Sequence, residues 1–413
     1  MTYPQALDVL FTQLPMFQRT GPAAYKVDLD GTWRVLEMLG RPEEGLQVIH
    51  VAGTNGKGTV CHLVAAALQS AGYRVGLFTS PHLKDFRERI RVNGACIPEA
   101  EVVAFVERYE HDWAAIAPSF FELTFGMALA HFKASAVDVV VLETGMGGRL
   151  DSTNVFPQPL VTAVTNVGWD HQQFLGQTIR AIAAEKAGIV KDGCPVVVGR
   201  MRPEALSVVH EHALRHAAEV YSADLEHEPA APSAVFTENR ATARAICRVL
   251  AALPGWNLPD TAIATGFERY AELTGQRGRY EWLPPTASGA RVLADCAHNL
   301  DGLTALTGTL ATLEFDRLHV VYGTVSDKDM AGIWPILPAA TYYWCAADIP
   351  RARPAADLAA EAAQHGHHGT PHPSVSAAYE AARTAAASAD LVLVTGSIFT
   401  VADALPDERF TLE

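Results

Sequence analysis

An apolar strand pattern runs directly into a glycine-rich turn and then into an apolar-periodic helix between Val48 and Val60. Glycines let the backbone turn tightly and come close to an anion, and the N-terminus of the helix presents free N–H groups with a partial positive charge. Lys57 adds a mobile cation, and the Thr59 hydroxyl is available to bind Mg²⁺. This strand–turn–helix stretch predicts a phosphate-binding loop.

The loop departs from the generic P-loop pattern in two places. Val51 stands where that pattern has its first glycine, and Gly58 separates Lys57 from the hydroxyl residue Thr59. On this stretch alone, a structural turn rich in small residues remains the alternative to a nucleotide loop. The rest of the chain has to decide between them.

Strand and helix patterns alternate through both halves of the chain. Apolar runs predict strands, and apolar residues at every third or fourth position predict helices. The expected strands after the first lie at 74–79, 137–142, 161–165, 195–198, 291–294, 318–322, 341–345 and 391–395, and the clearest helices at 58–70, 101–111, 121–132, 179–190 and 239–253. The alternation predicts doubly wound α/β sheets, whose ligands bind at the carboxyl ends of the strands.

The length of 413 residues exceeds one ordinary core, so more than one domain is expected. Pro284-Pro285 and Ser288-Gly289 favour a linker, because a fresh strand pattern begins at Arg291. We therefore expect an N-terminal P-loop ATPase-type α/β domain over 1–283, a linker over 284–290, and a smaller C-terminal Rossmann-like α/β domain over 291–413.

The composition narrows the range of partners. A net charge of −14 disfavours broad electrostatic binding to nucleic acid or to an anionic membrane. The six cysteines lack a paired spacing, which is typical of reduced thiols, and neither a leader pattern nor a run of 18 apolar residues is seen. We expect a soluble, cytoplasmic monomer whose partners are small molecules.

Polar residues with possible chemistry follow several of the expected strands. Ser80 follows the strand at 74–79, Glu143 the strand at 137–142, and His171 the strand at 161–165. Carboxylate and hydroxyl oxygens suit Mg²⁺, whereas imidazole is unusual for it. Each also has an ordinary interpretation, as a turn serine, a solvated carboxylate and a surface histidine, and Lys186 in the helix at 179–190 would ordinarily be a surface lysine.

Together these stretches resemble folylpolyglutamate synthase and the bifunctional dihydrofolate synthase of bacteria, a branch of the Mur-ligase superfamily. The resemblance covers nearly the whole chain, and it accounts for the missing glycine because the phosphate loop of this family is shorter. It rests on Gly53-Thr54-Asn55-Gly56-Lys57-Gly58-Thr59, Ser80-Pro81-His82-Leu83, Arg87-Glu88-Arg89-Ile90, residues 143–154, Asp170-His171, Glu185-Lys186-Ala187-Gly188-Ile189, Asp295-Cys296-Ala297-His298-Asn299, Ser326-Asp327-Lys328-Asp329 and Thr395-Gly396-Ser397.

The resemblance implies a site for ATP and Mg²⁺, with a monovalent cation as a further option. The triphosphate would be held by Thr54, Asn55, Gly56, Lys57, Gly58 and Thr59, the rest of the nucleotide would contact Asn239, Arg279 and Asp295, and the metal ligands would be Ser80, Glu143 and His171. Lys186 matches a lysine that carries a carbamate in these enzymes. A carbamate turns the cation into an anion, so a buried lysine could lie beside metal ions.

The resemblance also implies where the pterin end of a substrate would lie. The matching positions are Asp28, Ser119, Phe120, Phe121, Glu122, Leu150, Asp151 and Ser152. Aromatic side chains suit stacking on a flat ring, although the two phenylalanines suit a core equally well. Phe86-Arg87 and Cys296 depart from the residues that the family usually carries, which bears on fine substrate contacts near 84–94.

The implied reaction is ATP-driven amide formation. A substrate carboxylate would attack the γ-phosphate to give an acyl phosphate, and the amine of L-glutamate would then displace phosphate. Lys57, Lys186 and His298 would be the catalytic residues, and the acceptor would be dihydropteroate, the γ-carboxylate of a reduced folate, or both. The alternatives are a Mur ligase for peptidoglycan precursors, which usually carries Gly-Lys-Thr-Thr in the loop, and a P-loop nucleotide switch without ligase activity.

Overall fold

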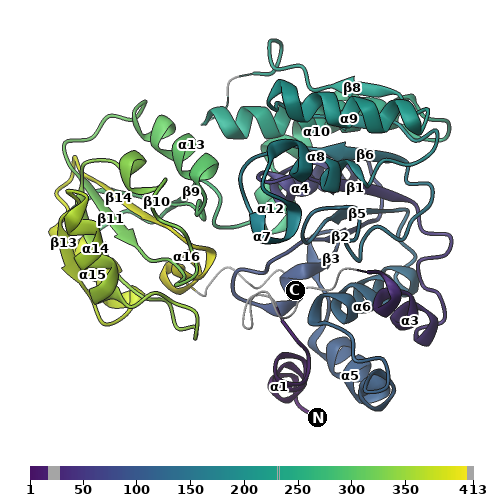
Figure 1. Ribbon diagram of the computed structural model, residues 1–413, viewed down its shortest axis with the longest axis horizontal. Helices are drawn as coiled ribbons and strands as arrows, with labels where there is room; N and C mark the ends of the chain where they lie inside the picture. Colours follow the sequence, from purple (N-terminus) through teal and green to yellow (C-terminus); the bar gives the residue numbers. More distant parts are fainter. Residues whose placement is uncertain (17–27, 230, 232, 407–413) are drawn as a thin grey trace. The chain divides into compact units, whose positions relative to one another are not determined.

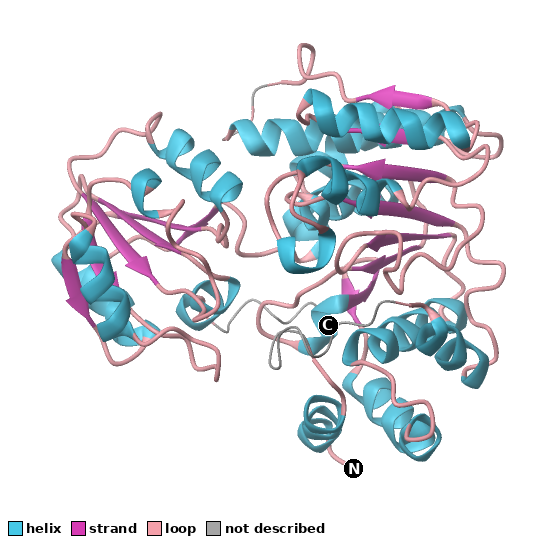
Figure 2. Cartoon of the chain, viewed as in Figure 1, coloured by secondary structure: helices cyan, strands magenta, loops and turns pink. Residues whose placement is uncertain are grey.

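The computed structural model describes residues 1–16, 28–229, 231 and 233–406, and it forms two compact units (Figure 1). The first unit comprises Met1–Ala231 with Val235–Gln276, and the second comprises the residues from Arg277 onward with the short stretch that ends at Ala234. In each unit strands form the centre and helices surround them (Figure 2). The α/β fold class predicted from the alternating patterns is confirmed.

The first unit is built on an eight-stranded sheet in the order β4-β3-β2-β5-β1-β6-β7-β8. Its strands are β1 (Val48–Ala52), β2 (Val75–Phe78), β3 (Ile90–Val92), β4 (Ala95–Cys96), β5 (Val139–Glu143), β6 (Val161–Val164), β7 (Val196–Val198) and β8 (Val220–Ser222). All neighbours pair in parallel except β3 and β4 at one edge. Because β1 lies between β5 and β6, the turn that follows β1 meets the carboxyl ends of both neighbours.

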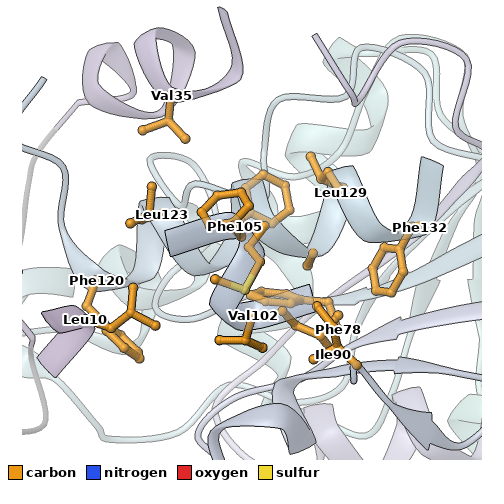
Figure 3. Packing of buried hydrophobic residues seen from close by; sticks show 14 of the residues in the cluster. Leu10, Val35, Phe78, Ile90, Val102, Phe105, Phe120, Leu123, Leu129 and Phe132 are labelled. Carbon is orange, nitrogen blue, oxygen red and sulfur yellow. The ribbon is translucent and has the colours of Figure 1, made fainter. Parts of the chain in front are cut away.

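Helices cover both faces of this sheet. They are α1 (Tyr3–Gln13), α3 (Asp30–Met38), α4 (Lys57–Ser70), η2 (Phe86–Arg89), α5 (Glu99–Trp113), α6 (Phe120–Ala134), α7 (Gln172–Leu175), α8 (Ile179–Ala187), α9 (Pro203–Arg215), α10 (Ala234–Ala252), α11 (Asp260–Glu268) and α12 (Tyr270–Thr274). Alternate residues of a strand point to opposite faces. Val140 and Leu142 therefore join the core under α1, α3, α5 and α6 (Figure 3), while Val139 and Val141 join the core under α4, α10 and α11.

Helix α4, which follows the glycine-rich turn, is clamped between the sheet and helix α11. At Gly266 of α11 an added Cβ would lie 2.5 Å from the Cα of Ala67, so the two helix backbones nearly touch. Ala65, Ala66 and Ala67 supply the small side chains that permit this approach, and all three are fully buried. The position of α4, and hence of the turn at its N-terminus, is fixed by close packing.

The second unit is built on a six-stranded sheet in the order β13-β12-β11-β14-β10-β9. Its strands are β9 (Glu281–Leu283), β10 (Arg291–Ala294), β11 (Leu318–Tyr322), β12 (Thr341–Trp344), β13 (Gly369–Pro371) and β14 (Leu391–Thr395), and only β9 runs antiparallel to its neighbour. Its helices are α13 (Leu300–Leu310), η3 (Trp334–Ile336), α14 (Ala355–Gln364), α15 (Val375–Ala385) and α16 (Ile398–Ala404).

Several boundaries differ from those expected from sequence. Pro284 and Pro285 lie in the connection between β9 and β10, so the proline pair belongs to a hairpin of the second sheet. Helix α10 begins at Ala234 instead of Asn239, so it is one turn longer at its N-terminus than expected. Among the described residues, no helix combines the length and the apolar character needed to cross a bilayer.

The contact between α4 and α11 makes a stability prediction. Gly266→Ala should lower the stability of the first unit by about 1–3 kcal/mol, because a methyl group has no room against Ala67. Gly308→Ala in α13 is the matched control, since nothing lies within 4 Å of its added Cβ; it should stabilise its helix by about 0.5–1 kcal/mol. Calorimetric unfolding of both variants checks this, and a Gly266→Ala transition at or above the wild-type temperature would contradict the packing argument.

Candidate active site

Two glycines give the turn after β1 its shape. Gly53 and Gly56 have φ values of 153° and 80°, which side-chain-bearing residues rarely adopt. An added Cβ at Gly53 would lie 1.9 Å from Thr165 Oγ1, and one at Gly56 would lie 2.1 Å from Asn239 Oδ1. The turn therefore packs directly against the end of β6 and against α10, and this contact brings Asn239 to the predicted phosphate loop.

The segment after β6 holds the loop through a set of hydrogen bonds. Asn55 N donates to Asn166 Oδ1 (2.9 Å), Thr54 N to Asn166 O (3.0 Å), Gly168 N to Thr54 Oγ1 (2.9 Å), and Thr165 Oγ1 to Asn55 O (2.7 Å). In this region the sequence predicted a role only for His171. The signal for the others was a run of polar residues directly after a strand that neighbours β1.

Two lysine ammonium groups share one carbonyl oxygen of the loop. Lys57 Nζ donates to Gly53 O (3.1 Å) and Thr54 O (3.2 Å), and Lys186 Nζ donates to Gly53 O (2.9 Å). Lys186 is only 3% exposed, so it is not the surface lysine that its helix pattern also allowed. Burial and the charge of Lys57 lower the pKa of Lys186 to about 7, and Asp170 and Asp151 only partly oppose them. A neutral amine is therefore accessible near neutral pH.

Glu143 and Ser80 meet at the first turn of α4. Glu143 is 5% exposed, and its Oε2 accepts a hydrogen bond from Ser80 N (2.9 Å). An added Cβ at Gly58 would lie 3.4 Å from the same oxygen. The glycine between Lys57 and Thr59, which breaks the generic pattern, therefore lies beside this carboxylate, at a distance that a Cβ would fill with ordinary van der Waals contact.

His171, the third predicted metal ligand, is exposed and precedes α7. Its backbone N–H donates to Asp170 Oδ1 (3.0 Å), and its Nε2 lies 3.9 Å from Asp170 Oδ2. Across the described ranges, no three His, Cys, Asp or Glu side chains gather as a ready-made metal cage. Of the predicted set, Ser80 and Glu143 suit an ion such as Mg²⁺, which keeps waters and takes phosphate oxygens as ligands, whereas the imidazole of His171 is an unusual ligand for it.

A buried arginine lies near the same carboxylate. Arg89 is 3% exposed, its Nε donates to His82 Nδ1 (2.7 Å), and its guanidinium stacks over the Phe120 ring at 5.2 Å. Burial lowers the pKa of Arg89 to about 10, while Glu143 and Glu88 raise it; burial and Arg89 also hold the pKa of His82 well below its usual range. Arg89 belongs to a motif that carried the family resemblance, but the sequence predicted no role for it.

Three of the predicted pterin positions converge with a residue that sequence analysis missed. Ser119 N donates to Glu122 Oε2 (2.6 Å), and the buried Thr32 hydroxyl donates to Ser152 Oγ (3.0 Å) and approaches Glu122 Oε1 (3.5 Å). These contacts join α3, α6 and the 145–154 loop. Thr32 gave no signal in the sequence, because a single threonine in a short helix has no distinctive pattern.

The other predicted pterin positions differ in their surroundings. Asp151 accepts hydrogen bonds from Met146 N (2.8 Å) and from Thr153 N (3.0 Å), and burial raises its pKa. Phe120 is buried in the first core, whereas Phe121 is partly exposed and lies against Gly145. Asp28 is exposed and accepts from Asp30 N, and Leu150 is partly buried. Their roles remain predictions.

In the second unit the predicted residues gather after β10. Asp295 accepts hydrogen bonds from Tyr280 N and Ala297 N, both at 2.8 Å. Burial raises the pKa of Asp295, and the Arg279 guanidinium opposes that shift. His298 Nδ1 lies 3.0 Å from Cys296 O, next to Asn299, whose side chain caps α13. The order β10, Asp295, His298, α13 repeats the strand–turn–helix arrangement of the first unit.

Two family models match the chain. The Mur ligase middle domain matches residues 51–240, and the Mur ligase glutamate ligase domain matches residues 278–398. The chain is 34% identical to the dihydrofolate synthase/folylpolyglutamate synthase of Escherichia coli over 97% of this chain and 95% of that protein. It is 35% identical to a probable bifunctional folylpolyglutamate synthase/dihydropteroate synthase of Halobacterium salinarum over 98% of this chain, and it spans about half (51%) of that relative's length.

Solved structures agree with these matches. E. coli FolC in complex with DHPP and ADP superposes with a TM-score of 0.82 at 31% identity, covering 97% of this chain and 96% of that chain. A bifunctional folylpolyglutamate synthase/dihydrofolate synthase with Mn, AMPPNP and L-glutamate bound superposes with a TM-score of 0.82 at 29% identity, covering 97% of both chains.

The lowered pKa of Lys186 predicts a pH-dependent contribution to stability. The folded lysine loses its proton near pH 7 and the unfolded lysine only near pH 10.4, so between these values the unfolded state binds more protons and stability rises with pH. Lys186→Met should have a higher free energy of unfolding than wild type. This difference should be largest below pH 7 and should shrink by a few kcal/mol towards pH 10. Denaturant titrations in CO₂-free buffer check this, and a difference independent of pH would contradict it.

Proposed function

Because the chain belongs to the dihydrofolate synthase/folylpolyglutamate synthase family of Mur ligases, we propose that it joins L-glutamate to a pterin-type acceptor through an amide bond, driven by ATP. The acceptor is dihydropteroate, the γ-carboxylate of a reduced folate, or both. The observation that carries the proposal is the cluster at the carboxyl ends of β1, β5 and β6, where the loop, Glu143 and Lys186 meet. Similar proteins solved with DHPP and ADP, and with Mn, AMPPNP and L-glutamate, support these ligand classes.

In this proposal the loop residues 54–59 bind the triphosphate. The backbone N–H groups at the start of α4 and the helix dipole favour the anion. Lys57 exchanges its hydrogen bonds to Gly53 O and Thr54 O for phosphate oxygens, which releases two carbonyls and neutralises charge on the γ-phosphate. Asn239 lies against Gly56 and so is near enough to the loop to contact the nucleotide.

The donor set at the first turn of α4 fits a divalent cation. Thr59, Ser80 and Glu143 offer two hydroxyls and a buried carboxylate, which are hard oxygen ligands of the kind that Mg²⁺ prefers. A bound Mg²⁺ would neutralise phosphate charge as the γ-phosphoryl group is transferred. Ser80 N–H donates to the Glu143 carboxylate, and the Glu143 charge raises the pKa of the nearby Arg89.

The reaction we propose proceeds in two steps. A carboxylate oxygen of the acceptor bonds to the γ-phosphorus while the bond from that phosphorus to ADP breaks, which gives an acyl phosphate. The glutamate amine then bonds to the acyl carbon, loses a proton, and the carbon–oxygen bond to phosphate breaks. The protein contributes by positioning both reactants away from water. We assign His298 to the glutamate side, because it follows β10 within the Mur ligase glutamate ligase match.

We further propose that Lys186 carries a carbamate. Its neutral amine, accessible near pH 7 because of burial, would bond to the carbon of CO₂ and release one proton. The resulting anion removes the repulsion between Lys186 and Lys57 and adds two oxygens that suit a metal site. A ¹³C NMR carbamate signal in enzyme equilibrated with labelled bicarbonate, absent from Lys186→Met, would support this; its absence from wild type would end the idea.

The pterin end is proposed to contact the cluster of Ser119, Glu122, Ser152 and Thr32. These side chains supply hydroxyl and carboxylate groups beside the partly exposed Phe121 ring, a combination that suits a flat heterocycle with polar edges. We also propose that the protein acts as a cytoplasmic monomer.

ATP turnover tests the proposed function. ADP release should rise at least tenfold when L-glutamate and dihydropteroate or tetrahydrofolate are added together with Mg²⁺, because the acyl phosphate is consumed only when the amine is present. Lys57→Ala should abolish this turnover, whereas Lys133→Ala, a lysine on the first unit that bonds to Glu44 O, should leave it unchanged. Turnover that responds to a peptidoglycan precursor, or that ignores both acceptor and glutamate, would contradict the proposal in favour of a Mur ligase or a nucleotide switch, respectively.

A further inference from the structure

The segment that ends the first unit is anchored on helix α4. Gln276 Nε2 donates to Thr59 Oγ1 (3.3 Å), and His62 Nδ1 lies 2.8 Å from Thr274 Oγ1. Thr59 and His62 face the same side of α4, one turn apart. Helix α12, which leads into this segment, packs along α4 (Figure 1). The end of the first unit therefore touches the helix that begins at the phosphate loop at two points.

The two contacts differ in whether each polar atom has a hydrogen-bond partner. The Thr274 hydroxyl donates to Tyr270 O, so it must accept from His62 Nδ1–H, and both partners are satisfied. At Gln276 the amide nitrogen reaches Thr59, but Oε1 is buried and has no hydrogen-bond partner among the described residues. A buried acceptor without a partner costs free energy. The Thr274 contact has its hydrogen bonds made, whereas Gln276 Oε1 still needs a hydrogen-bond donor.

The contact with Gln276 also decides what the Thr59 hydroxyl can do. A threonine inside a helix commonly donates to the carbonyl four residues earlier, which here is Asn55 O. Among the described residues that carbonyl accepts the Thr165 hydroxyl at 2.7 Å, and the hydrogen bond of the Thr59 hydroxyl is the one from Gln276. Since Thr59 Oγ1 accepts from Gln276, the hydroxyl retains one lone pair and its proton for a ligand.

We propose that Gln276 is a positioning residue, which orients the Thr59 hydroxyl toward the divalent cation of a bound nucleotide. The unpaired Oε1 then accepts a hydrogen bond from a donor that arrives with the metal–nucleotide complex, such as a water of the ion. This inference rests on the proposed nucleotide site and adds to it a residue outside every motif that carried the family resemblance.

The test is nucleotide binding measured by calorimetry with AMPPNP, first in EDTA and then over a Mg²⁺ titration. Wild type should bind more tightly as Mg²⁺ rises. Gln276→Leu should bind AMPPNP in EDTA as tightly as wild type does. The increase in affinity that Mg²⁺ produces should be about five- to tenfold smaller than in wild type, the effect expected of one hydrogen bond. Gln276→Met, of similar length, should show the same loss and guards against a folding defect specific to leucine.

Two comparisons show whether Gln276 acts through Thr59. Thr59→Val should lose at least as much of the Mg²⁺ gain, and Gln276→Leu should add nothing further in that background. Thr274→Val removes the neighbouring anchor on the same segment, so it should lower stability but keep the full gain from Mg²⁺.

The outcomes distinguish a failure of the role of Gln276 from a failure of the proposed nucleotide site. A full Mg²⁺ gain in both Gln276 variants, or losses that add in the double variant, would overturn the role of Gln276 while leaving the nucleotide site intact. A wild-type protein that binds no AMPPNP at any Mg²⁺ concentration would overturn the proposed nucleotide site and this inference with it.

Discussion

Two ammonium groups converge on the carbonyl oxygen of Gly53, and the rest of the site is arranged around that contact. Lys57 reaches it from the first turn of α4 and Lys186 from α8. Burial, together with repulsion between the two cations, lowers the pKa of Lys186 to about 7. The arrangement is relieved by anything that brings negative charge: phosphate groups at Lys57, or a carbamate at Lys186. A site built in this way favours an anionic ligand before any specific contact is counted.

The strand order explains how these groups meet. Because β1 lies between β5 and β6, its loop has Glu143 on one side and the Thr165–Gly168 segment on the other. Glu143 reaches the first turn of α4 beside Gly58, and Asn239 lies so close to Gly56 that a Cβ there would clash with it. Gly56 is thus a position where a neighbouring segment requires glycine. Close packing of α4 against α11 holds the helix, and therefore the loop, in place.

The sequence predicted the features that depend on local patterns. Long β-branched runs such as β5 and β11 predicted the sheets, and glycine spacing predicted the loop between β1 and α4. Short strands such as β4 and β8 were missed because two or three residues carry no periodicity, and the proline pair at 284–285 indicated a linker when it belongs to a hairpin. Local patterns do not predict contacts between distant segments: the resemblance placed Asn239 and Gly56 at one nucleotide, but nothing in the sequence links Thr32 to Ser152 or Gln276 to Thr59. The helix pattern alone did not predict the burial of Lys186, since one lysine suits a surface as well as a site; only the resemblance implied it.

The central claim is that ATP activates a carboxylate of the acceptor as an acyl phosphate. The most direct measurement uses dihydropteroate labelled with ¹⁸O in its carboxylate, together with ATP, Mg²⁺ and L-glutamate, and determines the isotope content of the released phosphate by mass spectrometry. The carboxylate oxygen that bonds to phosphorus leaves with it when the amine attacks, so one ¹⁸O should appear in phosphate for each amide formed. Amide formation with unlabelled phosphate would contradict the account.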